Sequence, residues 1–277
     1  MKYHLCAWLI LLGLGCRSRQ PTEQPASADS SATYRMPYRL TEPDQRYKLP
    51  SSLKEISGLA YYKDDQLLCV QDEKAVVYVY DTRRQRVNDE FNFGGYGDFE
   101  GVEWVGGEVY VLESDGTLFR FKPGSKKIGR TGTDLPAKTE VEGLGYDSRA
   151  NRLLLAVKEG VPPAEKRIYS FDLRTKTVYK VWVVAGSRLD EVGIDGRKFK
   201  PSGLAVHPIS GDWYLLSSTG RQLLVTNAKG ELLSSAPLDP EQLRQPEGIC
   251  FAPNGDLFIA SEGDGKAGYI LQFGYQP

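Results

Sequence analysis

The sequence contains few of the residues from which zinc sites and nucleophilic hydrolases are built. Only two histidines and four cysteines occur among 277 residues, and His4, Cys6 and Cys16 all lie near the N-terminus. Zinc prefers His and Cys ligands, so a zinc centre is not expected in the rest of the chain. The sequence also lacks a Gly-x-Ser-x-Gly elbow and a phosphate-binding loop. The remaining His207 is therefore expected to be a structural residue.

An excess of basic residues is missing as well. The chain has 35 Lys and Arg against 36 Asp and Glu, and no basic stripe, so nothing indicates a nucleic-acid partner. Long helical periodicity is nearly absent, whereas short apolar runs alternate with turn residues. This pattern predicts an all-β protein, and the length is sufficient for one large domain.

The first residues are typical of a targeting segment. Lys2 precedes an apolar run from Leu5 to Leu14, and small residues lead to Cys16. Residues 1–15 are therefore predicted to be a lipoprotein signal peptide, with a lipid attached to Cys16. The alternative is an ordinary cleaved signal in which Cys16 is incidental. The apolar run is short for a transmembrane helix.

A lipid on Cys16 predicts that the protein is anchored to a membrane of the bacterial cell envelope, either in the periplasm or exposed at the surface. The periplasm is favoured because no acidic cluster follows the cysteine. Residues 16–37 are rich in Ser, Pro, Gln and Ala and predict a flexible tether. Residues 38–277 are predicted to form the folded domain. Cys69 and Cys250 lie in apolar runs and are expected to be buried free thiols, with a single disulfide as the alternative.

One unit recurs five times along this domain. Each copy has an anchor glycine followed by an apolar strand, a turn and a second strand with polar or acidic residues at its end. The anchor glycines are spaced by 43, 42, 60 and 45 residues. They are Gly58, Gly101, Gly143, Gly203 and Gly248. The long interval contains an insertion at residues 186–199.

Four strands in about 45 residues are typical of a β-propeller blade. The fifth unit ends after its third strand, so residues 38–49 are expected to supply the fourth strand and to close the ring. The sequence thus predicts a five-bladed propeller closed by the N-terminal strand. A six-bladed ring is the alternative, with a further blade around the insertion.

In each unit, carboxylates or hydroxyls occur immediately before the anchor glycine of the first strand and at the end of the second strand. Because these strands are antiparallel, the two sets of side chains are expected to surround one mouth of the central channel. Two carboxylates about 6 Å apart repel by roughly 3 kcal/mol at an effective dielectric constant near 20. Such a group must therefore take up protons or bind a cation.

Carboxylate oxygens are hard ligands that suit Ca²⁺. The predicted calcium ligands are Glu100, Glu142, Glu247, Glu159 and Asp72. The residues expected to line the mouth are Ser57, Glu73, Glu113, Ser202 and Glu262. The alternative is that Glu or Ser before a glycine accepts hydrogen bonds from the backbone of a turn, and Ser57 and Ser202 are expected to do this first.

The segments EISGLAYYKDDQLLCVQDE, DFEGVEW, KPSGLAVHP and PEGICFAPNGDLFIASEG resemble the SdiA-regulated (YjiK-like) family of bacterial propellers. The resemblance extends from about residue 38 to residue 277. It implies a five-bladed propeller with a calcium site, distantly related to NHL-repeat and gluconolactonase-type propellers. It does not by itself imply an activity.

Two functions are compatible with these features. The first is a lipid-anchored, calcium-binding propeller that holds a small ligand, glycan or protein at its acidic mouth. The second is a calcium-dependent hydrolase of the lactonase or esterase kind, with Glu142 or Glu247 as general base. The insertion at residues 186–199 is expected at a rim of the channel, either as a gate or as a solvated loop.

Overall fold

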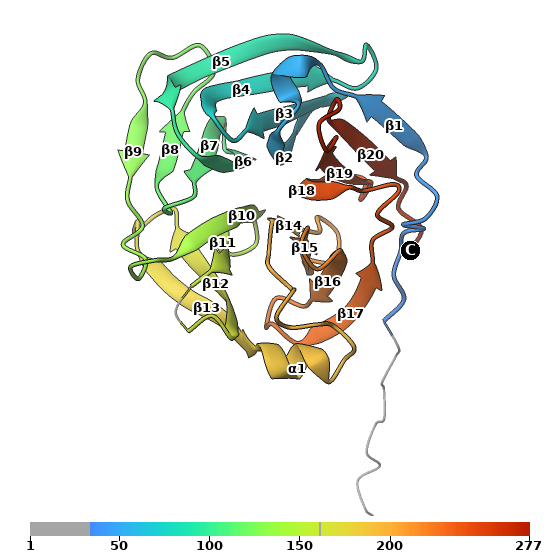
Figure 1. The fold of residues 1–277 in the computed structure, drawn as a ribbon. Helices are drawn as coiled ribbons and strands as arrows, with labels where there is room; N and C mark the ends of the chain where they lie inside the picture. The colour runs from blue at the N-terminus through green and yellow to red at the C-terminus, as the bar shows by residue number, and fades with distance from the viewer. Residues whose placement is uncertain (1–33, 161) are drawn as a thin grey trace, which may run out of the picture. The chain divides into compact units, whose positions relative to one another are not determined.

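A computed structural model describes residues 34–160 and 162–277. In this part of the chain, twenty strands form five four-stranded antiparallel sheets. Figure 1 shows them as the blades of a ring, with strands β2, β6, β10, β14 and β18 nearest its centre. The predicted five-bladed propeller is therefore confirmed, and the six-bladed alternative is wrong. The expected signal peptide, Cys16 and most of the tether lie outside the described residues.

Each of the first four blades follows chain order from the centre of the ring to its outside, which is the topology of consecutive hairpins. The strands are, blade by blade, β2 (Ile56–Lys63), β3 (Gln66–Gln71), β4 (Lys74–Asp81) and β5 (Arg86–Tyr96); β6 (Phe99–Val105), β7 (Glu108–Glu113), β8 (Leu118–Phe121) and β9 (Gly129–Thr131); β10 (Glu140–Asp147), β11 (Arg152–Glu159), β12 (Glu165–Asp172) and β13 (Val178–Ala185); β14 (Gly203–Val206), β15 (Trp213–Ser217), β16 (Gln222–Thr226) and β17 (Leu232–Pro237); and β18 (Gln245–Phe251), β19 (Leu257–Glu262) and β20 (Tyr269–Phe273).

The fifth blade is completed by the N-terminal strand β1 (Gln45–Lys48), which pairs antiparallel with β20. The hydroxyl of Tyr47 donates a 2.6 Å hydrogen bond to Gln272, and the guanidinium of Arg46 lies 3.7 Å from the centre of the Tyr269 ring. Joining both ends of the domain in one sheet removes the unpaired edge that an open blade would expose. The expected closure is confirmed.

The anchor glycines are required because neighbouring inner strands pack against one another. A Cβ atom on Gly58 would lie 2.8 Å from the Cα atom of Gly101, and one on Gly203 would lie 2.5 Å from the carbonyl oxygen of Glu247. A Cβ atom on the last anchor glycine, Gly248, would lie 2.8 Å from the Cβ atom of Leu59 in the first blade. A larger residue at these positions would push adjacent blades apart. The repeated glycine therefore allows the inner strands to pack closely around a narrow channel.

Apolar side chains from adjacent blades pack together in five clusters. Cys69 and Cys250 lie in one of them as free, buried thiols, as expected. The short helix η1 (Ser51–Leu53) contributes the fully buried Leu53 to the same cluster. Burial of these alternating faces is the main favourable contribution to stability.

The insertion forms the short helix α1 (Gly186–Asp190) and a returning loop, residues 191–199, that leads back toward β14. Three of its apolar side chains, Leu189, Ile194 and Phe199, are buried in the cluster between the third and fourth blades. Most other residues of the insertion are exposed, so it is a solvated segment that these three side chains attach to the core. Among the described residues, no helix is long and apolar enough to cross a membrane.

Candidate functional site

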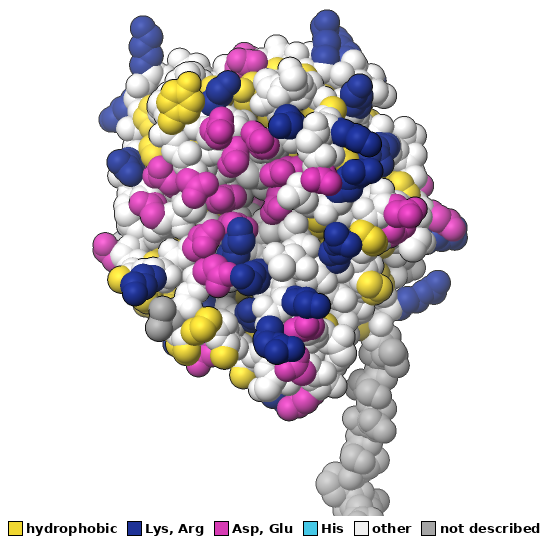
Figure 2. All heavy atoms as spheres, in the orientation of Figure 1, with side chains coloured by type: hydrophobic (Ala, Val, Ile, Leu, Met, Phe, Trp, Pro, Cys, Tyr) yellow, Lys and Arg dark blue, Asp and Glu magenta, His cyan; other side chains and the backbone are white. Residues whose placement is uncertain are grey.

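Three glutamates from different blades line a narrow void at the centre of the ring. Glu100 on β6, Glu142 on β10 and Glu247 on β18 each precede an anchor glycine, so the blade repeat places them at one level. The void has a volume of about 10 Å³, and Ser57 also lines it. In Figure 2, acidic side chains gather around the centre of this face of the ring.

These carboxyl groups are shielded from water, and this raises their pKa values. Burial, followed by the charges of Glu142, Asp98 and Glu247, raises the pKa of Glu100 to about 9. Burial, followed by the charge of Glu142, raises the pKa of Glu247 to about 8. Glu142 is 3% exposed, and burial raises its pKa to about 7 although Lys158 opposes the shift. The three groups therefore compete for protons near neutral pH.

Lys158 is the cation nearest to these carboxylates. Its ammonium forms an ion pair with Glu142 and lies 3.7 Å from Glu140. Burial lowers the pKa of Lys158, but the carboxylates of Glu142, Glu140 and Glu247 outweigh this effect and raise it to about 12. Lys158 therefore stays protonated and offsets one of the three negative charges.

Two serines hold the backbone beside the glutamates. The hydroxyl of Ser57 donates to the carbonyl of Phe99 at 2.6 Å, and that of Ser202 donates to the carbonyl of Pro246 at 2.8 Å. Ser202 also accepts a 3.1 Å hydrogen bond from the backbone N–H of Ser218. Each serine hydroxyl thus bridges to the next blade. Ser202 also makes the expected bond to a turn, because Ser218 is a turn residue, whereas Ser57 has no such bond among the described residues.

A second acidic group lies between the first and fifth blades. The pKa of Asp72 is raised by burial and by the charges of Glu55 and Glu73, and its Oδ1 has no hydrogen-bond partner among the described residues. Burial and the charges of Asp72 and Glu55 raise the pKa of Glu262 to about 6. Asp72, Glu73 and Glu262 are therefore near one another, but none of them lines the central void.

The other two expected site residues form ion pairs outside the void. Glu113 pairs with Arg130 at 3.3 Å, and Glu159 pairs with Lys200. Glu159 lines a separate pocket beside the insertion. Of the five predicted calcium ligands, the structure therefore brings Glu100, Glu142 and Glu247 to one place, whereas Asp72 and Glu159 lie elsewhere.

The sequence analysis does not predict the contacts of two further acidic residues, Glu103 and Asp98. Glu103 accepts a 3.0 Å hydrogen bond from the backbone N–H of Tyr146 in the next blade, and burial raises its pKa to about 8. An alignment of the five repeats would have singled out Glu103, because the other four blades have Ala, Gly or Cys at this position. Asp98 accepts a 2.6 Å hydrogen bond from the hydroxyl of Ser114, and its charge raises the pKa of Glu100 and Glu142.

The donor set fits calcium in its chemistry, since carboxylates and backbone carbonyls are hard oxygen ligands. Within residues 34–160 and 162–277, however, no group of three or more acidic, His or Cys side chains is already arranged to hold a metal ion. The Lys158 ammonium instead contacts Glu142. A metal ion would therefore require the carboxylates to converge and Lys158 to move away.

The model of the SdiA-regulated family matches residues 38–264. The chain belongs to the SdiA-regulated family. This match covers most of the described residues and includes all five anchor glycines and the three glutamates of the central void. The resemblance seen in the repeated segments is thereby confirmed.

Solved structures similar to this member of the SdiA-regulated family support its fold. A streptogramin B lyase has a TM-score of 0.50 and 12% identity over 78% of this chain and 65% of its own. The PQQ-bound aldose sugar dehydrogenase from Streptomyces coelicolor has a TM-score of 0.52 and 13% identity over 84% of this chain and 97% of its own.

A protein of unknown function from Bacteroides thetaiotaomicron VPI-5482 has a TM-score of 0.52 and 12% identity over 80% of this chain and 56% of its own. The chain thus spans less than two thirds of the lyase and of the Bacteroides protein. At this level of identity, the three similarities establish the fold and no activity.

Proposed function

We propose that this protein binds a calcium ion at the central void and uses the surrounding acidic mouth to hold a ligand or partner. The observation that carries the proposal is that Glu100, Glu142 and Glu247, from three different blades, line one narrow void. Their raised pKa values mean that deprotonation is costly without a cation. Calcium would hold the second, third and fifth blades together while balancing these charges.

The size of the void favours an ion over an organic substrate. Small-molecule sites usually have volumes of roughly 300–1,000 Å³, whereas this void has about 10 Å³, room for a single ion or water molecule. A ligand or partner would therefore bind at the mouth and not inside the void. Tyr96, the last residue of β5, is 84% exposed and offers the kind of aromatic side chain that binding surfaces favour.

A calcium-dependent hydrolase of the lactonase or esterase kind is the second candidate. It is favoured by Glu142, because a carboxyl group with a pKa of about 7 is suited to proton transfer near neutral pH. A bound calcium ion would supply polarisation of a carbonyl group. The small void argues against this candidate, since the scissile group of a substrate must reach the carboxylate.

Calorimetric titration of chelated protein with calcium tests the first candidate. We expect heat of binding and a higher melting temperature, with both reduced by Glu142→Gln or Glu247→Gln. Glu90→Gln is the control, because Glu90 is exposed on β5 and its carboxylate makes no hydrogen bond or ion pair within the described residues. Absence of both heat and stabilisation at millimolar calcium would refute the proposal. Turnover of lactones or esters that disappears with chelator would instead favour the hydrolase.

We also propose that the protein is anchored to a membrane of the cell envelope through a lipid on Cys16, most simply facing the periplasm. Support comes from the apolar run and small residues that precede this cysteine. A lipid-modified N-terminal peptide in mass spectra, together with release of a Cys16→Ser variant from the membrane fraction, is the expected result. An unmodified Cys16 in the membrane-bound protein would contradict it.

A further inference from the structure

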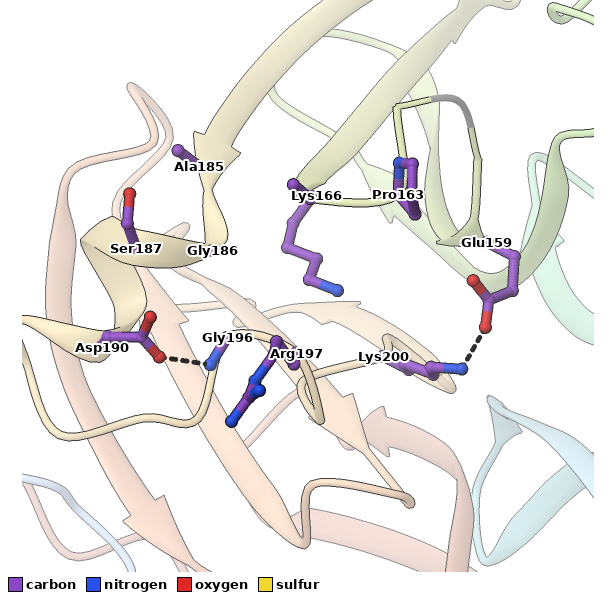
Figure 3. A pocket seen from close by; sticks show the side chains of 11 residues that line it. Glu159, Pro163, Lys166, Ala185, Gly186, Ser187, Asp190, Gly196, Arg197 and Lys200 are labelled. Atoms are coloured by element: carbon purple, nitrogen blue, oxygen red, sulfur yellow. Dashed lines mark hydrogen bonds and ion pairs between the residues drawn. The ribbon is translucent and has the colours of Figure 1, made fainter.

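A pocket of about 460 Å³ lies beside the insertion, away from the central void. Figure 3 shows β12, the end of β13, helix α1 and the returning loop around it. The aliphatic parts of its wall come from Pro163, Ala164 and Ala185. Its volume is within the range of sites that hold small molecules.

Lys166 is the distinctive residue of this pocket. It is 4% exposed, and its side chain extends into the pocket in Figure 3. Its ammonium has no hydrogen bond or ion pair with any described residue, and burial lowers its pKa. The adjacent Arg167 is equally buried, but its guanidinium pairs with Glu165 at 2.8 Å. The side chain is therefore mostly buried, while its ammonium reaches the pocket without a protein partner, which is unusual within its own strand.

The walls of the pocket are held by backbone contacts. The N–H of Gly186 donates to the carbonyl of Ala164 at 2.7 Å, and the N–H of Gly196 donates to the carboxylate of Asp190 at 2.9 Å. A Cβ atom on Gly196 would lie 2.2 Å from the carbonyl oxygen of Gly186. The returning loop is thus fixed close to the start of α1, and the pocket is a built feature of the fold.

The charges around the pocket leave Lys166 without a committed counter-ion. Glu159 is the acidic residue whose charge most raises the pKa of Lys166, but its carboxylate is already paired with Lys200. Arg197 is at the opening, where its side chain is 95% exposed. Asp190 accepts the hydrogen bond from Gly196. The pocket therefore presents a free positive charge inside an aliphatic wall.

We propose that this pocket binds a small organic anion, with its acid group on the ammonium of Lys166 and its apolar body against Ala164 and Ala185. A carboxylate or phosphate would form a charge-assisted hydrogen bond with Lys166 and replace the solvation that burial removes. The aliphatic wall favours a short hydrocarbon chain over a fully hydrated ion. This site is independent of the proposed calcium site.

Ligand-observed NMR titration of the full chain with butyrate, 1-butanol and inorganic phosphate tests this proposal. Butyrate carries both the charge and the apolar chain, whereas each of the other probes carries only one. We expect butyrate to bind more tightly than either. Lys166→Met should weaken butyrate binding by about tenfold or more, which is the effect expected from losing a charge-assisted hydrogen bond. Lys126→Met is the control, because Lys126 is exposed and far along the chain from the pocket.

A second variant keeps the buried charge and fills the space. Ala164→Phe replaces an exposed side chain of the pocket wall and is expected to abolish butyrate binding without unfolding the protein. Lys166→Met is expected to melt at the same temperature as the wild type or higher, because it removes an unpaired buried charge. The proposal would be overturned if butyrate does not bind, if 1-butanol binds as tightly as butyrate, or if phosphate binds more tightly than butyrate. It would also be overturned if Lys166→Met binds butyrate as tightly as the wild type.

Discussion

The hydroxyl of Ser57 donates a 2.6 Å hydrogen bond to the carbonyl of Phe99, the residue immediately before Glu100. Ser202 does the same at 2.8 Å to Pro246, immediately before Glu247. In both cases the serine precedes the anchor glycine of one blade and holds the backbone of the next blade. Two of the three glutamates of the central void are therefore positioned by a residue at the equivalent place in the preceding blade.

Replacing Ser202 by Ala removes this contact between the fourth and fifth blades. We expect a loss of about 1 kcal/mol in the free energy of unfolding, the net contribution of a typical buried hydrogen bond. Urea denaturation measures it, with Ser235→Ala on the exposed side of β17 as the control. Equal midpoints for the two variants would show that the hydrogen bond does not hold the blades together.

Stability should fall as the pH rises from about 5 to about 9 in the presence of chelator. The folded-state pKa values of Glu142, Glu247 and Glu100 are raised to about 7, 8 and 9. The folded state thus binds more protons than the unfolded state in this window, and stability present below the unfolded pKa is lost as the pH rises through these values. Each group contributes at most about 1.4 kcal/mol per pH unit.

Melting temperatures measured across this pH range check the prediction. Glu100→Gln should make the decline shallower, because the amide does not titrate. Saturating calcium should also reduce the decline if the proposed site is correct, since the ion favours the deprotonated carboxylates. A profile that is flat, or that rises with pH in chelator, would contradict the assigned shifts.

Lys158 pairs with Glu142 and would compete with calcium for its carboxylate, and Lys158→Met tests both roles. Without calcium, the variant should lose roughly 1–3 kcal/mol at pH 8, because the carboxylate of Glu142 loses its partner. With calcium, it should bind the ion more tightly than the wild type, because Lys158 no longer competes for the carboxylate. Calorimetry and thermal melting measure both effects. Weaker calcium binding by the variant would mean that Lys158 supports the site.

Gly203→Ala tests the packing of the inner strands. The added Cβ atom would lie 2.5 Å from the carbonyl oxygen of Glu247, which is backbone and has little freedom to move. We expect a loss of about 1–3 kcal/mol, the usual cost of overpacking. Gly95→Ala is the matched control, because nothing lies within 4 Å of its added Cβ atom. Similar denaturation midpoints for both variants would contradict the proposed close approach of the blades.

The repeat period allowed the five blades, the closing strand and the level of Glu100, Glu142 and Glu247 to be predicted from the sequence. These features follow from chain order, because each blade begins at its glycine and consecutive blades are neighbours. The partners of the remaining acids were not predictable in the same way. Glu159 is at a strand end equivalent to that of Glu262, yet it pairs with Lys200. Lys200 lies three residues before the anchor glycine of the next blade, a position at which none of the other blades has a basic residue.

The sequence by itself determined the architecture, since glycine spacing and alternating apolar residues repeat at the period of a blade. Only the tertiary structure decided which charges meet. The ion pair of Lys158 with Glu142 depends on the register of β10 and β11, and the pocket around Lys166 depends on the burial of Leu189, Ile194 and Phe199 from the insertion. Such contacts depend on the direction and depth of side chains, which a repeat pattern in one dimension does not specify.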